Sequence, residues 1–200
     1  MRKQMRTVLE LPAGYEQIEE IDLQKDKRLM FLVNGAALGI LAVLGVLGNL
    51  AVPIGTLYDA GAGIGAMLLR IGVLLAGIVC YIALHELVHG VFIRRYSGRP
   101  ASYGFTGVYA CAGSAAYFAK RDYFVIALAP VVLWGAVLAV MAPLVPRSWF
   151  WVVYFIQLVN LSGAAGDLYV VWHFRKLPPS ILVQDRGVSM AVYAPAHEGK

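Results

Sequence analysis

The chain has 200 residues, of which 60% are hydrophobic and 14% are charged, and its net charge is +5. These proportions exclude an ordinary soluble globular domain and indicate an integral membrane protein with room for one bundle of about four spans. The basic residues stand at the ends of apolar runs, so they indicate membrane topology and do not predict a nucleic-acid partner.

The first 28 residues contain six basic and six acidic residues, and the first apolar run comes after them. A cleavable signal peptide would be shorter and poor in acidic residues. We expect a soluble cytosolic arm with a turn at residues 12–14 and a short surface helix from Glu16 into the first span. That span is predicted over about residues 29–52.

The second apolar run covers residues 71–93, which is long enough to cross a bilayer with some tilt. Within it stand His85, Glu86 and His89, in the pattern His-Glu-x-x-His. On a helix the two histidines share one face, where two neutral imidazoles can bind one zinc ion at about 2.0–2.1 Å. Glu86 lies next to them and is the candidate general base that takes a proton from water.

Ionisable side chains inside a span are costly, roughly 2.5–3.5 kcal/mol for a charge at the membrane centre. One alternative is that these three residues only hydrogen-bond helices together. We favour a metal site because the spacing is the one that zinc hydrolases require. The cysteines Cys80 and Cys111 are assigned neither to a disulfide nor to the metal.

Residues 102–120 are rich in aromatic and small residues and lack helical periodicity. Their aromatic side chains fall on odd positions and residues 112–114 favour a turn, which predicts a short membrane-associated β-hairpin, with an irregular loop as the alternative. An open strand edge there would hold an extended substrate by β-augmentation, with Phe105 and Tyr109 as substrate-binding side chains.

The third span is predicted over about residues 123–145, with Pro130 as a kink and Pro143 near its end, and the fourth over about residues 149–174. In the tail, residues 181–183 and 188–193 predict a second hairpin around a turn at 184–187. Fifteen of the 17 basic residues then fall on the side of both termini, which should be cytosolic.

The predicted fold is therefore an all-α integral membrane protein, a four-span helical bundle with one small β-hairpin between spans two and three. Three regions are expected: a cytosolic arm (residues 1–28), a transmembrane core (29–174) and a cytosolic tail (175–200).

A catalytic zinc site usually has three protein ligands, so one more is needed. Asp167 lies about 12 Å from the basic residue that ends its span, and His85 and His89 lie about 13 and 8 Å from the basic residue that follows theirs. The three side chains should therefore lie at a similar depth in the membrane, which makes Asp167 the candidate third ligand. The alternative is a carboxylate that only packs helices together. Asn160 is on the same helix face as Asp167, and it is a candidate to bind a substrate carbonyl or to hydrogen-bond between helices.

Five stretches carry a resemblance to a known family: L-P-A-G-Y-E-Q-I-E-E-I-D-L-Q-K-D-K in the arm, A-L-H-E-L-V-H-G, R-D-Y-F-V-I-A-L-A-P, N-L-S-G-A-A-G-D-L-Y, and V-Q-D-R-G in the tail. Together they resemble a bacterial family of small zincin membrane peptidases, formerly a domain of unknown function, which is similar to the site-2 proteases. The resemblance implies zinc held by His85, His89 and Asp167, with Glu86 catalytic. The fourth span differs from site-2 proteases, which typically have a proline between the asparagine and the aspartate and a glycine after the aspartate, whereas here the intervening run is glycine and alanine and Leu168 follows.

These observations predict a zinc-dependent intramembrane endopeptidase in a bacterial cell membrane, acting on membrane protein or peptide substrates. Two other functions remain open. One is a non-catalytic zinc-binding or metal-sensing membrane protein, and the other is a scaffold whose polar residues only fix helix packing.

Overall fold

The computed structural model describes residues 6–22, 24–107 and 110–196. Its α-helices are α1 (Lys27–Ala51), α2 (Ile64–Ser97), α3 (Lys120–Met141), α4 (Phe150–Gly163) and α5 (Ala165–Phe174), with 3-10 helices η1 (Ile54–Leu57) and η2 (Arg147–Trp149). Its strands are β1 (Tyr15–Asp22), β2 (Ser102–Phe105), β3 (Ala110–Gly113), β4 (Tyr117–Ala119), β5 (Leu182–Asp185) and β6 (Ser189–Pro195).

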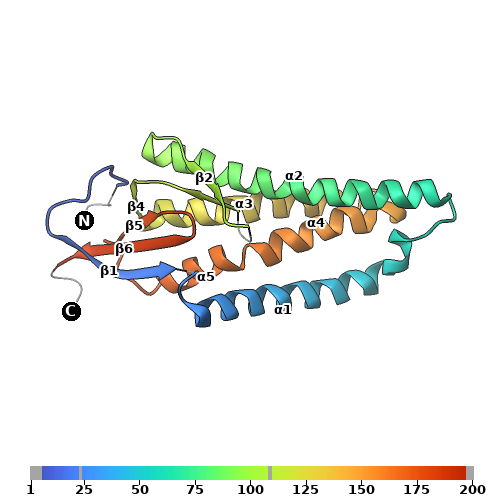
Figure 1. Ribbon diagram of the computed structural model, residues 1–200, viewed down its shortest axis with the longest axis horizontal. Helices are drawn as coiled ribbons and strands as arrows, with labels where there is room; N and C mark the ends of the chain where they lie inside the picture. The colour runs from blue at the N-terminus through green and yellow to red at the C-terminus, as the bar shows by residue number, and fades with distance from the viewer. Residues whose placement is uncertain (1–5, 23, 108–109, 197–200) are drawn as a thin grey trace. The chain divides into compact units, whose positions relative to one another are not determined.

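The prediction of an all-α fold is wrong. In addition to the helices, the described residues form two antiparallel sheets, a four-stranded sheet in the order β1-β6-β5-β4 and a two-stranded sheet of β2 and β3 (Figure 1). The larger sheet joins the two ends of the chain, since Tyr15 in β1 is paired with Pro195 in β6. Pairing over such a sequence distance is set by tertiary contacts, which local periodicity does not reveal.

The surface helix expected from Glu16 is also wrong, because those residues form β1 along the edge of the larger sheet. The helix begins later: Oδ1 of Asp26 accepts hydrogen bonds from the backbone N–H groups of Arg28 and Leu29, which caps the start of α1. The expected hairpin in the tail is present as β5 and β6, joined by a turn with Gly187 at φ 93°.

The expected hairpin after α2 is also present, but its turn differs from the prediction. Residues 112–114, where the turn was placed, belong to β3 or follow it, and the connection between the strands is 106–109. Part of this connection, residues 108–109, lies outside the described residues.

Four helical segments are long and apolar enough to cross a membrane in the part of the chain that the structure describes: residues 27–51, 64–97, 120–141 and 147–174. They match the four predicted spans, although the second extends further in both directions and the fourth is divided into η2, α4 and α5. Large apolar side chains on them are exposed, such as Phe31 at 71% and Leu50 at 76%. An exposed apolar surface of this kind is expected where helices face lipid.

The chain divides into two compact units, and the helices supply residues to both. The first unit contains residues 1–32, 86–130 and 167–200, and therefore both sheets. The four-stranded sheet has a cluster of buried side chains, Leu182, Ala191 and Tyr193. Packed against this cluster are Val8, Leu11, Tyr15 and Tyr117. The four-stranded sheet thus has an apolar core of its own.

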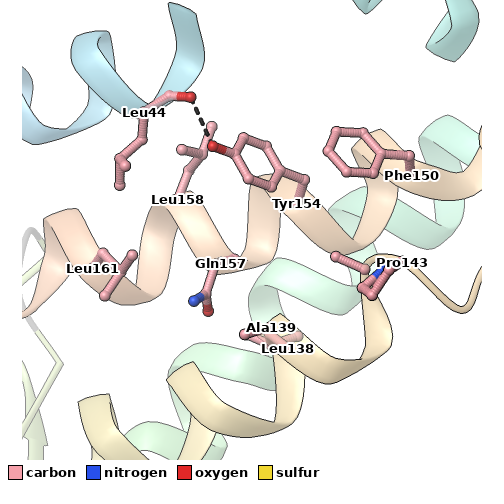
Figure 2. Close-up of a pocket in the computed structure, with 10 residues that line it drawn as sticks. Leu44, Leu138, Ala139, Pro143, Phe150, Tyr154, Gln157, Leu158 and Leu161 are labelled. Carbon is pink, nitrogen blue, oxygen red and sulfur yellow. Dashed lines mark hydrogen bonds between the residues drawn. The ribbon is translucent and has the colours of Figure 1, made fainter. Parts of the chain in front are cut away.

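The second unit contains residues 33–85 and 131–166. Its core is a cluster of Leu57, Leu74, Trp151, Val152 and Leu158. It also holds a cavity of about 280 Å³ with a mainly apolar lining from α1, α3 and α4 and the turn after α3 (Figure 2). Gln157 is one polar residue of the lining, and Tyr154 donates a hydrogen bond to the carbonyl of Leu44.

Candidate metal centre

The His-Glu-x-x-His pattern lies inside α2, an unbroken helix of 34 residues. Because a helix repeats every 3.6 residues, His85 and His89 project from one face, one turn apart. The division between the two units falls between His85 and Glu86, but the helix continues through it. The position of His85 relative to His89 therefore follows from helix geometry.

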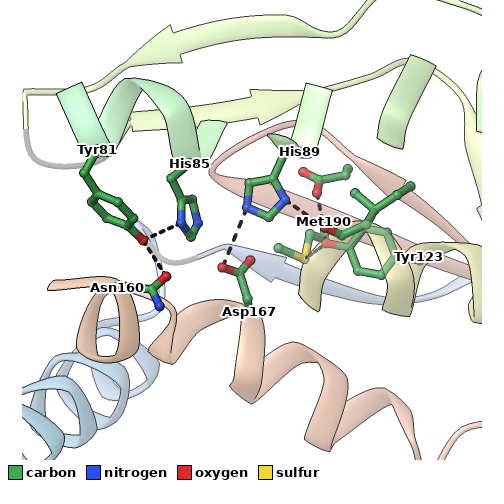
Figure 3. A network of polar contacts seen from close by, with 9 residues as sticks. Tyr81, His85, His89, Tyr123, Asn160, Asp167 and Met190 are labelled. Atoms are coloured by element: carbon green, nitrogen blue, oxygen red, sulfur yellow. Dashed lines mark hydrogen bonds and ion pairs between the residues drawn. The ribbon is translucent and has the colours of Figure 1, made fainter. Parts of the chain in front are cut away.

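Asp167 comes from the fourth candidate span, which breaks into two helices just before it. α4 ends at Gly163, and the backbone N–H of Ala164 closes it by donating to carbonyl oxygens of the last turn. Because α5 begins at Ala165, Asp167 stands in its first turn, where the helix dipole favours a carboxylate. Oδ2 of Asp167 lies 3.8 Å from Nε2 of His89 (Figure 3).

The structure brings three of the predicted residues together. His85, His89 and Asp167 each offer one ligand atom, and these atoms lie within 4.8 Å of one another. In a tetrahedral zinc site with bonds of about 2.0–2.1 Å, neighbouring ligand atoms are about 3.3 Å apart, so small side-chain rotations would close the set on an ion. Two imidazoles and a carboxylate also leave a fourth position for water or substrate, as catalytic zinc sites do. The residues present therefore fit zinc.

A backbone carbonyl orients the ring of His89. Nδ1 of His89 lies 2.9 Å from the carbonyl oxygen of Ile126 on α3. Since a carbonyl only accepts, Nδ1 carries the proton and the lone pair is on Nε2, the atom that faces Asp167. Pro130 makes this carbonyl available, because it stands four residues after Ile126 inside α3 and has no N–H to donate back to it.

Glu86 follows His85 on α2 and is partly buried. Adjacent helical residues project about 100° apart, so Glu86 points beside the ligand face. The charge of Glu86 acts on Cys111 of β3: the pKa of this thiol is raised mainly by burial and also by Glu86. This position beside the ligand set suits a proton acceptor better than a ligand.

Asn160 is fully buried in the second unit. Its Oδ1 accepts a hydrogen bond from the hydroxyl of Tyr81, and its Nδ2 donates to the carbonyl of Val131 and to Oε1 of Gln157. These contacts are hydrogen bonds between and within helices, one of the two interpretations that the sequence left open. Substrate binding by Asn160 stays a prediction.

The β2–β3 hairpin lies against the part of α2 that carries His89. A Cβ on Gly90 would collide with the hydroxyl of Tyr103, so β2 contacts the helix one residue after His89. Phe105 at the end of β2 is 73% exposed. Tyr109, the other predicted substrate-binding residue, lies outside the described residues.

A buried acid in the first unit was missed in the sequence. Asp185 accepts hydrogen bonds from the hydroxyl of Tyr123 at 2.9 Å and from the backbone N–H of Gly187 at 2.8 Å. The pKa of Asp185 is raised to about 7, mainly by burial and also by the charges of Asp167 and Glu86. The Asp-x-Gly turn was visible in the sequence, but the burial of its carboxyl was not.

Tyr81 is a second residue that was missed, and here the sequence held a signal. It stands four residues before His85, on the same helix face, and its hydroxyl lies 2.7 Å from Nδ1 of His85 (Figure 3).

The site and the helices define a class of protein: one with a group of two histidines and an aspartate that could hold a metal ion, and with helices apolar enough to cross a membrane. Comparison with protein families agrees, since residues 78–182, more than half of the chain, match the family described as "Putative zincin peptidase". The chain belongs to this family, whose description implies a metallopeptidase and zinc. A search of the curated proteins and a search of the solved structures found no match.

Proposed function

We propose that the protein is a zinc-dependent intramembrane endopeptidase, similar to the site-2 proteases, that cleaves membrane-embedded substrates. The observation that carries this proposal is the approach of Asp167 to His89, with His85 one turn away, on helices apolar enough to cross a membrane. A polar metal site would be expensive in lipid without a function that requires it.

In this proposal His85, His89 and Asp167 hold the ion. Zinc bound there would supply Lewis acidity, which makes water acidic and polarises a peptide carbonyl. Glu86 takes the proton of the attacking water and delivers it to the leaving amine. Its place one residue after His85 and beside the ligand face allows both transfers without displacing a ligand.

The hairpin is the part of the chain that we propose holds the substrate. A peptide inside a helix has its carbonyls hydrogen-bonded and must become extended before cleavage. β2 is paired with β3 in the described residues, and its contact with Gly90 sets it beside the histidine helix. An extended peptide added at the other edge of β2 would run past the metal ligands, with Phe105 exposed to receive an apolar side chain.

The test separates the peptidase from a zinc-binding protein without activity. Purified wild-type protein and its Glu86→Gln variant are incubated in vesicles with a membrane proteome, new N-termini are counted, and zinc content is measured on the same samples. We expect equal zinc, with cleavage only by the wild type, because the change removes a base and no ligand.

Glu20→Gln, the same change at a surface position of β1, is the matched control and should cleave normally. If the wild type binds zinc but produces no new N-termini, a non-catalytic zinc-binding or metal-sensing role replaces this proposal. If Glu86→Gln cleaves as fast as the wild type, Glu86 is not the base.

A further inference from the structure

In the second unit the side chains of Gln157, Asn160 and Tyr81 form a hydrogen-bonded row that ends at the ring of His85. The hydroxyl oxygen of Tyr81 lies 2.7 Å from Nδ1 of His85 and 2.8 Å from Oδ1 of Asn160 (Figure 3). Tyr81 is only 6% exposed and Asn160 is not exposed at all. Buried polar groups cost free energy unless they are hydrogen-bonded, so the geometry of these hydrogen bonds should be closely defined.

The direction of the row is fixed by backbone carbonyls. Nδ2 of Asn160 donates to the carbonyl of Val131, and Nε2 of Gln157 donates to the carbonyl of Gly135, each at 3.3 Å. A carbonyl can only accept, so neither amide can be turned over without setting two oxygens against each other. The oxygen of Asn160 therefore faces Tyr81, and the oxygen of Gln157 faces Nδ2 of Asn160.

The tyrosine hydroxyl has one proton, and it lies within hydrogen-bond distance of both Asn160 and His85. Because Oδ1 of Asn160 is an acceptor, it takes that proton, and the hydroxyl oxygen is left to accept from Nδ1 of His85. The neutral imidazole then carries its proton on Nδ1 and its lone pair on Nε2. If the hydroxyl pointed the other way, it would donate to Nδ1 and move the imidazole proton to Nε2.

From this geometry we infer that Tyr81 and Asn160 are positioning residues that fix the tautomer of His85, so that Nε2 is ready to bind the metal before the metal arrives. The inference rests on the proposed function, since it gives His85 the role of a ligand. It assigns to Asn160 a role through Tyr81, one that does not require contact with substrate. It also complements His89, whose tautomer is fixed by the Ile126 carbonyl on α3.

Partners of metal-bound histidines contribute about 10–100-fold to metal affinity, which sets the expected size of the effect. Asn160→Leu removes the acceptor, so the Tyr81 hydroxyl turns to donate to His85 and opposes zinc at Nε2. We expect zinc to bind about 10–100-fold more weakly in this variant. Tyr81→Phe removes the hydroxyl altogether, which removes one hydrogen bond to Nδ1 without reversing it, so the loss should be smaller.

The double variant Tyr81→Phe/Asn160→Leu is the sharpest test. Without the Tyr81 hydroxyl, the loss of Asn160 can no longer turn a donor toward Nδ1, so we expect the double variant to bind zinc as tightly as Tyr81→Phe and more tightly than Asn160→Leu. Tyr154→Phe is the matched control, because it removes a hydroxyl that donates to the carbonyl of Leu44, and its zinc affinity should be unchanged. Losses that simply add in the double variant would overturn the inference, since general damage to packing would produce them.

A second measurement does not depend on zinc. Nitrogen-15 NMR of histidine in the metal-free protein distinguishes the two tautomers, with His85 assigned by its absence in His85→Ala. We expect the proton of His85 on Nδ1 in the wild type and on Nε2 in Asn160→Leu. A wild-type His85 with its proton on Nε2 would overturn the inference, whereas a wild type with the expected tautomer that binds no zinc would overturn the proposed function instead.

Discussion

Replacement of Pro130 by alanine should strengthen the fold and weaken the metal site at the same time. Alanine restores an N–H four residues after Ile126, and this group points at the carbonyl that His89 uses. A proline inside a helix costs up to about 3 kcal/mol, so α3 should become more stable. The carbonyl has two lone pairs and can keep part of its bond to His89, so we expect the lower end of the usual range, about tenfold weaker zinc binding or about 1.4 kcal/mol.

The assay for Pro130→Ala is zinc affinity by chelator competition, with thermal unfolding measured on the metal-free protein. Pro143→Ala is the control, because Pro143 lies in the turn after α3 and lines the apolar cavity. The two readouts should move in opposite directions in Pro130→Ala, which a general loss of structure cannot produce. Unchanged zinc affinity in Pro130→Ala would refute the argument that the proline orients His89 through Ile126.

Three further predictions follow from the rest of the chain. Proline substitution at successive positions of residues 104–109 should reduce cleavage while zinc content stays constant, and normal cleavage by every variant would exclude the hairpin as the substrate clamp. Reporter fusions should place both termini in the cytosol and residues 53–70 outside, and an external C-terminus would contradict the depth argument for Asp167. The pKa of Asp185 is raised from 3.8 to about 7, so between these pH values the folded state holds a proton on Asp185 that the unfolded state has released. The metal-free protein should therefore lose up to about 4 kcal/mol of stability as the pH rises from about 4 to 7. Asp185→Asn should remove this loss, and an equal pH slope in that variant would show that another group is responsible.

The grouping of His85, His89 and Asp167 could be predicted from the sequence because two simple rules act on these residues. Helical periodicity puts His85 and His89 on one face, and the distance of Asp167 from a basic flank gives its depth. Both rules need only local sequence and the thickness of a membrane. The structure brings these three residues together, as the two rules require.

The strands at the two ends of the chain could not be found in this way. β1 reads as charged surface, E-Q-I-E-E, and it becomes a strand because β6 pairs with it from the far end of the sequence. The hydrogen bonds that orient the two histidines were also hard to predict, although the spacing of Tyr81 and His85 was visible in the sequence. The carbonyl of Ile126 has no sequence signature except Pro130, and the direction of the Tyr81 hydroxyl depends on an amide from another helix.

The most direct test of the account is the zinc content of the purified protein, measured by mass spectrometry after dialysis against a weak chelator and resupply of zinc. We predict one zinc per chain in the wild type and in Glu86→Gln, and a large loss in Asp167→Ala. Asp122→Ala is the matched control, because Asp122 accepts a hydrogen bond from Thr7 and is not one of the three grouped ligands, so it should keep its zinc. A wild-type protein that carries no zinc and binds none when zinc is supplied would contradict the account.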